Sequence, residues 1–193
     1  MTLDAQPQGE YGLAMNTIAR DSLSDLRPAT LGLTLAILTI LFGQLLGIVF
    51  GLNEEAIKSR LLASANPVRD SVYQGNETAI KSVQDKSWTY MKRAHLHAGS
   101  MGTTAVALIV LISLLGLSRV ATAAISLALG AGGLGYSVFW MWAGFLAPGL
   151  GSTGAAKESL RWLAMPSSGA YVLATLATLV CVGLALYRSR PPA

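Results

Sequence analysis

Two histidines separated by a single residue, His95 and His97, are the side chains of this sequence best suited to chemistry by type and spacing. Imidazole binds haem iron and copper and carries protons near neutral pH. Residues two apart on a regular α-helix point about 200° away from each other. Metal-binding pairs on one helix are instead three or four residues apart. We therefore expect either a locally irregular helix or two histidines that serve different partners.

The neighbours of the pair define a candidate cofactor site. Above His95, on the same helical face, Ala98 and Gly102 are small enough to admit a planar ring system. We expect His95 to ligate haem b or copper, and His97 to hydrogen-bond nearby, with a methionine or a partner's side chain completing the coordination. The candidate cofactor-binding residues are His95, His97, Met91, Gly102 and Trp140, and the candidate metal ligands are His95, His97, Met101 and Met141.

A second interpretation needs no cofactor. Histidines at a membrane interface hydrogen-bond loop carbonyls or lipid headgroups, as Trp and Tyr do at the same depth. On this interpretation the chain is a cofactor-free structural membrane protein or a small-molecule channel.

The segment 93–102, Arg-Ala-His-Leu-His-Ala-Gly-Ser-Met-Gly, resembles the start of a span in small membrane haem proteins and in relatives of haem–copper oxidase subunits. The resemblance is confined to this motif and implies haem or copper binding and electron transfer. Those families commonly take a second histidine from another helix, and this sequence has only two histidines, both in the motif. The resemblance therefore implies that Met, Tyr, a second copy or a partner subunit supplies the other ligand.

Long apolar runs must position this motif. The sequence is 52% apolar and 12% charged, whereas soluble domains carry about 25% charged residues. Runs near the roughly 20 residues that cross a bilayer contain no Asp, Glu, Lys, Arg or His and cover 31–52, 98–117, 120–146 and 170–187. The sequence predicts an all-α integral membrane protein with four transmembrane helices in an antiparallel bundle. Residues 1–30 are expected to form a mobile tail, and 31–193 the membrane domain.

The first two helices are predicted to continue out of the membrane as a helical hairpin, 53–97. Asn66-Pro67 should end the first helix, and Asn76 should cap a second helix that runs to about residue 117. Within the first span, small residues recur every four positions and end at Gly47 and Gly51. We expect the glycine faces of the first and third spans, including Gly47 and Gly133, to pack against each other.

The same sequence argues against several functions. Spans without ionisable residues are atypical of secondary transporters, and scattered basic residues do not form a nucleic-acid groove. The glycine pattern 149–154 lies between two spans rather than after a strand, which excludes a nucleotide site. No catalytic set can be built near the histidines, so the chain is not expected to be an enzyme on its own.

The expected partners are the lipid bilayer and other membrane subunits or a second copy, in an assembly that is redox-linked if the cofactor is present.

Orientation depends on a divided charge pattern. Segment 52–97 carries seven Lys or Arg residues but also five acids. An even number of spans puts both termini on one side, together with the 117–119 turn. That side carries Arg20, Arg27, Arg119, Arg188 and Arg190. We expect a bacterial inner-membrane protein with both termini in the cytoplasm.

Overall fold

The computed structural model describes residues 24–189. Within this range the chain is all-helical and has no β-strand. The five α-helices are α2 (Thr30–Ala65), α3 (Glu77–Ser113), α4 (Arg119–Leu146), α5 (Thr153–Ser159) and α6 (Arg161–Arg188). Short 3-10 turns, Arg27–Ala29 and Asn66–Val68, flank α2. Most of the predicted tail, 1–30, lies outside the described residues.

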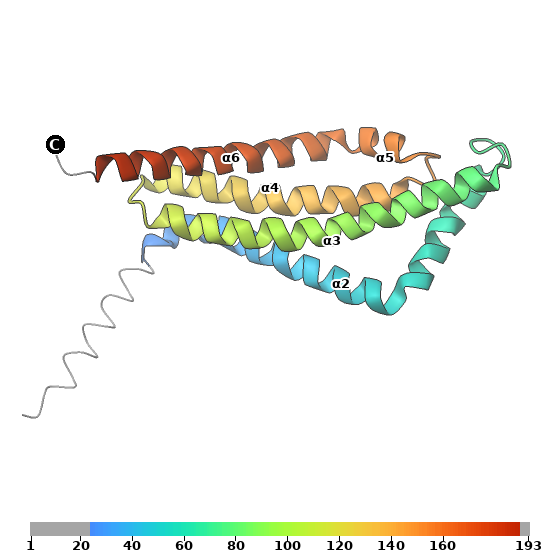
Figure 1. Ribbon diagram of the computed structural model, residues 1–193, viewed down its shortest axis with the longest axis horizontal. Coiled ribbons are helices and arrows are strands. Elements are labelled where there is room, and N and C mark those ends of the chain that lie inside the picture. Colours follow the sequence, from blue (N-terminus) through green and yellow to red (C-terminus); the bar gives the residue numbers. More distant parts are fainter. Residues whose placement is uncertain (1–23, 190–193) are drawn as a thin grey trace, which may run out of the picture.

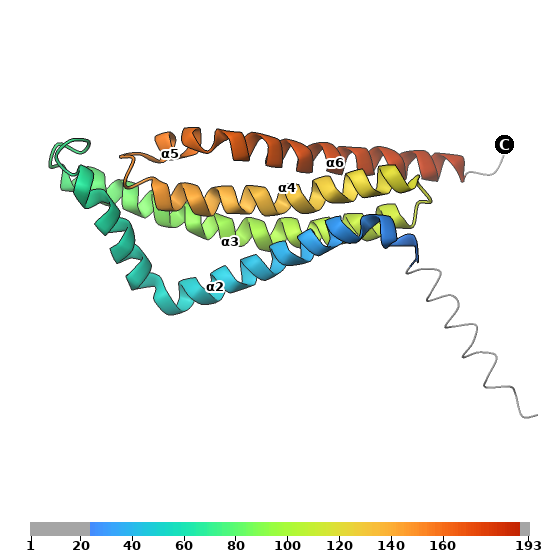
Figure 2. The ribbon, with the colours of Figure 1, turned by 180° about the vertical axis from the view of Figure 1, so that it is seen from behind.

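The four long helices lie side by side with α4 at the centre. α4 packs against α2, α3 and α6, whereas α6 packs mainly against α4. α2 and α4 lead away from the end at which the described chain begins and finishes, and α3 and α6 return to it (Figure 1 and Figure 2). We call this end, which includes the α3–α4 turn, the terminal end. The opposite end, with the α2–α3 and α4–α6 connections, is the loop end.

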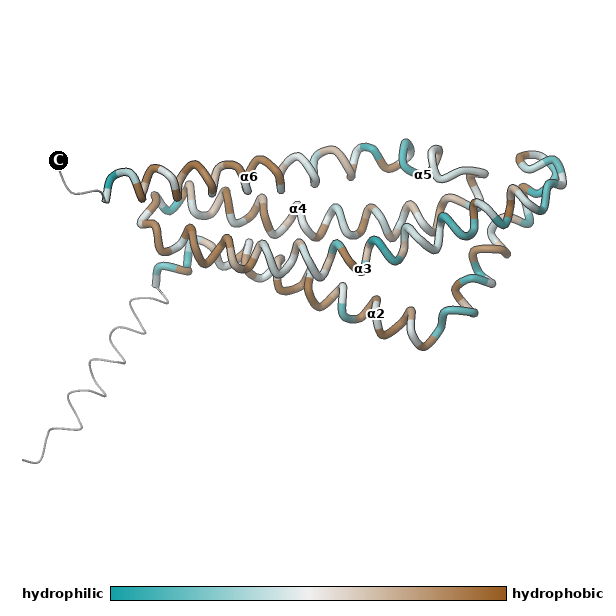
Figure 3. The backbone as a smooth tube through the Cα atoms, in the orientation of Figure 1, coloured by the Kyte–Doolittle hydropathy of each residue, from teal (hydrophilic) through white to brown (hydrophobic). Residues whose placement is uncertain are grey.

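α2 is bent at a single residue. Asn53 has non-helical backbone angles, φ −131° and ψ 26°, and its side-chain nitrogen donates to the carbonyl of Val49 at 3.2 Å. The part before the bend contains the predicted span 31–52, and the limb after it, 54–65, turns back toward the start of α3 (Figure 2). Hydrophilic residues gather in this limb and in the first turns of α3 (Figure 3). The predicted end of the helix before Asn66-Pro67 is confirmed, but the bend was not predicted.

α3 is one continuous helix that contains both histidines. Its first turn is capped by Asn76, whose side-chain oxygen accepts from the backbone N–H of Ala79 at 3.0 Å. This confirms the predicted start. The helix ends at Ser113 rather than near residue 117, because the chain turns through Gly116, whose φ of 63° suits glycine. Ser118 then caps α4 by accepting from the N–H of Ala121.

The glycines of α2 pack against α3. A Cβ atom on Gly43 would lie 3.0 Å from Ala98, and one on Gly47 would lie 2.8 Å from Cε1 of His95. A Cβ atom on Gly51 would meet no atom within 4 Å. The ridge of small residues therefore faces the second span, where its glycines make room for an alanine and an imidazole ring.

α2 and α4 meet through other glycines. A Cβ atom on Gly32 would collide with the backbone of Ser126, and one on Gly130 with the carbonyl of Gly32. Gly133 faces Tyr171 of α6 instead. The prediction that the first and third spans pack through glycine is correct for the helices but wrong for Gly47 and Gly133. A four-residue repeat of small residues shows that another helix can approach that face closely. It does not show which helix packs there.

Within the described residues, four helices are long and apolar enough to cross a membrane. Each keeps large apolar side chains exposed, and α6 is the least buried of them. Leu52 in α2 and Leu179 in α6, for example, are 79% and 67% exposed. The buried side chains lie where α4 meets its three neighbours and where α2 crosses α3.

Candidate functional site

His95 lies on the face of α3 that contacts α2, and it joins the two helices. Its Nδ1 lies 2.7 Å from the carbonyl oxygen of Gly43, and its ring fills the space that a side chain at Gly47 would occupy. A carbonyl oxygen only accepts, so Nδ1 carries the proton, and in the neutral ring Nε2 carries the lone pair. The contact holds α2 against α3 and leaves Nε2 as the nitrogen that could ligate a metal.

His97 faces α4. Its Nδ1 hydrogen-bonds within its own helix, 2.8 Å from the carbonyl of Arg93. Its ring centroid lies 5.4 Å from that of Tyr136 and 5.9 Å from that of Trp140. These contacts confirm that the two histidines serve different partners on a regular helix. Which of them binds a metal stays a prediction.

Arg93 lies against two aromatic rings near His97. Its guanidinium carbon is 5.5 Å from the ring centroid of Tyr90 and 5.1 Å from that of Trp140. The two rings meet edge to face at 4.8 Å. Such cation–π contacts contribute roughly 0.5–1 kcal/mol each at exposed sites. The aromatic cluster, as we call it, consists of Tyr90, Arg93, His97, Tyr136, Phe139 and Trp140.

Two further predicted site residues are packing residues in this structure. Met91 is fully buried, and it lies against Gly144 of α4. Gly102 is buried against Ile40 and Ala36 of α2. α2 therefore fills the room that the sequence left for a planar cofactor on the face of His95. The sequence showed small residues there, but not the helix that packs onto them.

The other two methionines lie in separate surroundings. The carbonyl of Met101 accepts from the hydroxyl of Tyr171 at 3.0 Å, and Met141 packs beside Phe50 and Leu61 near the bend of α2. The structure thus brings Trp140 to His97. Met91 and Met141 belong to one apolar cluster, whereas Met101 contacts α6 through its carbonyl. Among residues 24–189, no group of three or more His, Cys, Asp or Glu side chains is placed to hold a metal ion.

Sequence reasoning missed two partners of the histidines. The first is the carbonyl of Gly43. The sequence did contain a signal for it, because Gly43 and Gly47 lie one turn apart and together leave room for an imidazole ring on that face of α2. The second is Tyr136, which precedes Trp140 by one turn and so lies on the same face of α4. Both spacings were visible in the sequence, but the sequence did not show which helix each histidine would face.

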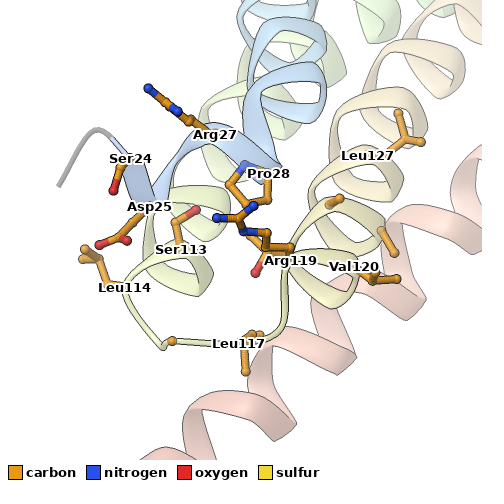
Figure 4. Close-up of a pocket in the computed structure, with 14 residues that line it drawn as sticks. Ser24, Asp25, Arg27, Pro28, Ser113, Leu114, Leu117, Arg119, Val120 and Leu127 are labelled. Atoms are coloured by element: carbon orange, nitrogen blue, oxygen red, sulfur yellow. The ribbon is translucent and has the colours of Figure 1, made fainter. Parts of the chain in front are cut away.

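Two cavities lie away from the histidines. One, of about 970 Å³, lies at the terminal end between the start of the described chain, the α3–α4 turn and the first turns of α4 (Figure 4). Arg27, Asp25 and Arg119 are among its lining residues (Figure 4). The other, of about 580 Å³, lies between the bend of α2 and α4. Neither His95 nor His97 lines either cavity.

Polar contacts fix the loop end. The hydroxyl of Tyr73 donates to the buried carbonyl of Pro148 at 2.8 Å, and burial raises the pKa of this phenol above 10.0. The side-chain amide of Gln84 donates to the carbonyl of Lys58 at 2.8 Å, which ties α3 to the limb of α2 after its bend. A hydrogen bond from Lys58 to Glu54 raises the pKa of the ammonium group above 10.5.

The two histidines have different surroundings and therefore different chemical roles open to them. His95 joins two helices through one nitrogen and keeps the other nitrogen as a potential ligand. His97 sits in the aromatic cluster beside a guanidinium group. In comparisons with known proteins, no family model, no curated protein and no solved structure matches this chain.

Proposed function

We propose that this chain is an integral membrane protein that crosses the bilayer four times as an antiparallel bundle. Its role is that of a subunit or accessory factor of a membrane assembly, in a bacterial inner membrane. The observation that carries the proposal is the exposed apolar surface on all four long helices. Apolar surface in water costs about 25 cal/mol per Å². The predicted spans contain no charged residue, and all but residues 114–117 of the second span fall within these helices.

The exposed face of α3 supports an assembly role. Ser100 and Thr103 are exposed at the depth of the predicted span, and each hydroxyl donates to a carbonyl one turn earlier, at 2.8 and 2.9 Å. A Cβ atom on Gly99 beside them would meet no atom within 4 Å. Small residues with internally bonded hydroxyls are typical of helix–helix contacts in membranes, because they let backbones approach closely. A helix from a second copy or from another subunit would fit this face.

The test is the size of the protein in a mild detergent, measured by native mass spectrometry. We expect the wild type to carry a second copy or a copurifying subunit. A double variant, Ser100→Leu with Thr103→Leu, is expected to lose it, because leucine side chains would hold the partner backbone away. Gly183→Leu, at an open position on α6, is the control and should keep the wild-type size. A monomeric wild type without a copurifying protein would refute the assembly role.

A redox-linked version of this role is a second candidate, and one observation favours it. The hydrogen bond from Nδ1 of His95 to a carbonyl is the arrangement that orients many metal-binding histidines, because it leaves Nε2 unprotonated. On this proposal Nε2 of His95 ligates copper rather than haem, because α2 fills the face on which a planar cofactor would lie. A partner's side chain supplies the other ligand. Visible absorption and metal analysis of the protein purified with its native partners test it. A colourless, metal-free complex would exclude it and leave the cofactor-free role standing.

A further inference from the structure

We propose that the cavity inside the bend of α2 binds one acyl chain of an anionic phospholipid, whose phosphate group is held by Arg60. This inference rests on the proposed membrane location, but it does not depend on the assembly role. It concerns the cavity of about 580 Å³ between α2 and α4, which the histidine pair does not line.

The walls of the cavity suit a hydrocarbon chain. Leu46, Val49 and Phe50 line it from the span part of α2, and Met141 and Phe145 line it from α4. Its volume lies within the roughly 300–1,000 Å³ of typical small-molecule sites. Val49 and Phe145 are 44% and 38% exposed, so the cavity is open toward the side on which lipid would lie.

The bend gives this cavity a polar rim. Asn53 interrupts the helix directly after the predicted span, 31–52, and the limb beyond it places Arg60 on the same cavity as the span residues. The span part would hold the acyl chain, and the end of the span would lie beside the headgroup. A lipid in a leaflet has its acyl chain and headgroup at these same two depths. Most residues of the limb are exposed, and hydrophilic residues are frequent in it (Figure 3).

The charge of the rim selects an anion. Among the residues that line the cavity, Arg60 is the charged one. No carboxylate of the described residues lies within ion-pair distance of it, whereas the nearby Lys58 is paired with Glu54 and Glu55. The hydroxyl of Ser64, at the same rim, donates to the carbonyl of Leu61 at 2.8 Å. A guanidinium group can bind a phosphate through two parallel hydrogen bonds, and basic pockets between membrane helices bind anionic headgroups.

The experiment uses the full chain in nanodiscs of phosphatidylglycerol and phosphatidylcholine with identical acyl chains. After release into mild detergent, native mass spectrometry counts the lipid that each protein molecule retains. We expect the wild type to retain phosphatidylglycerol in preference to phosphatidylcholine. Arg60→Gln should lower retention of phosphatidylglycerol about fivefold, which corresponds to about 1 kcal/mol for one arginine at a headgroup. Arg60→Lys should keep most of the preference.

Two matched controls separate the parts of the site. Lys92→Gln removes an exposed cation of α3 without touching the cavity, and retention should stay at the wild-type level. Val49→Phe fills the cavity and should lower retention of both lipids, whereas Ile48→Phe adds the same ring on the exposed face of the same helix and should not.

Equal retention of the two lipids by the wild type would overturn the proposal. So would equal losses in Arg60→Gln and Lys92→Gln, or a second copy or peptide, in place of lipid, that Val49→Phe displaces and Ile48→Phe leaves bound. Failure of the membrane location itself would be seen separately, as a chain that stays in solution without detergent or lipid.

Discussion

A polar ring between two apolar helices is stable when its N–H group has a hydrogen-bond acceptor and the ring fits the space between the helices. His95 meets both conditions. It donates to the carbonyl of Gly43, and it occupies the space over Gly47. Hydrogen bonds between membrane helices contribute about 0.6 kcal/mol on average and up to about 1.7 kcal/mol. The fit to Gly47 adds a packing contribution that only a small residue on α2 allows.

The two residues should therefore be coupled. Gly47→Ala is expected to destabilise the protein by about 1–3 kcal/mol, because the new methyl group would overlap the imidazole ring. In a His95→Ala background the same change should cost much less. The measurement is a double-mutant cycle of thermal unfolding in detergent. His97→Ala, which removes a hydrogen bond within one helix, serves as the control background. Equal costs of Gly47→Ala in all backgrounds would contradict the coupling.

Tyr73 offers a prediction that depends on pH. Its phenol donates to Pro148 only when protonated, and burial raises its folded-state pKa above 10.0. The stability that it contributes is therefore fully present below about pH 10 and is lost as the pH rises through the raised pKa. At pH 7, Tyr73→Phe should cost about 0.5–1.5 kcal/mol, and the difference from wild type should shrink above pH 10. Thermal unfolding at pH 7 and at about pH 10.5 would check this, with Tyr136→Phe as the comparison.

At the scale of elements, α2 and α4 approach each other closely enough at Gly32 and Gly130 for backbone to meet backbone. Gly32→Ala and Gly130→Ala should each destabilise the bundle by about 1–3 kcal/mol or more, because their methyl groups would meet backbone atoms rather than flexible side chains. Gly51→Ala, with open space around it, should be neutral or slightly stabilising. The melting temperatures of the three variants in detergent are the measurement. If Gly51→Ala proved as costly as the other two, the crossing would be misplaced.

The elements themselves could largely be predicted from the sequence. Apolar runs of the required length, the Asn76 cap and Asn66-Pro67 are local signals. The structure has helices over all four runs, except for residues 114–117 at the end of the second run. The bend at Asn53 has no such signal, because an asparagine is compatible with a straight helix as well. The residues through which the helices pack also escaped prediction. Whether Gly47 meets His95 or another helix depends on how whole helices rotate, which no single residue specifies.

The candidate site shows the same limit. Helical spacing alone separated His95 from His97, and the order of the spans placed Trp140 near the pair. The room expected above His95 was occupied by Ile40 and Ala36, because α2 lies where the sequence left only small residues. The space around a site belongs to residues distant in the sequence, so it could not be predicted from the motif.

At the scale of the whole molecule, both described chain ends and the α3–α4 turn lie together (Figure 1). The short segments at this end carry Arg27, Arg119 and Arg188, which favours the cytoplasmic side. A reporter that is active only in the cytoplasm should therefore be active when fused after residue 193. The same reporter inserted after Gln74, in the α2–α3 connection, should be inactive. The reverse pattern would invert the orientation.

The bend of α2 also determines the shape that the bundle presents to its surroundings. α2 lies close to α3 and α4 near the terminal end and diverges from α3 toward Asn53 (Figure 1 and Figure 2). In a bilayer, the molecule would therefore have a larger cross-section in one leaflet than in the other. Such a wedge displaces more lipid from the leaflet at the loop end. In a curved membrane it would accumulate where that leaflet is expanded, so the position of one asparagine would influence where in a cell the protein gathers.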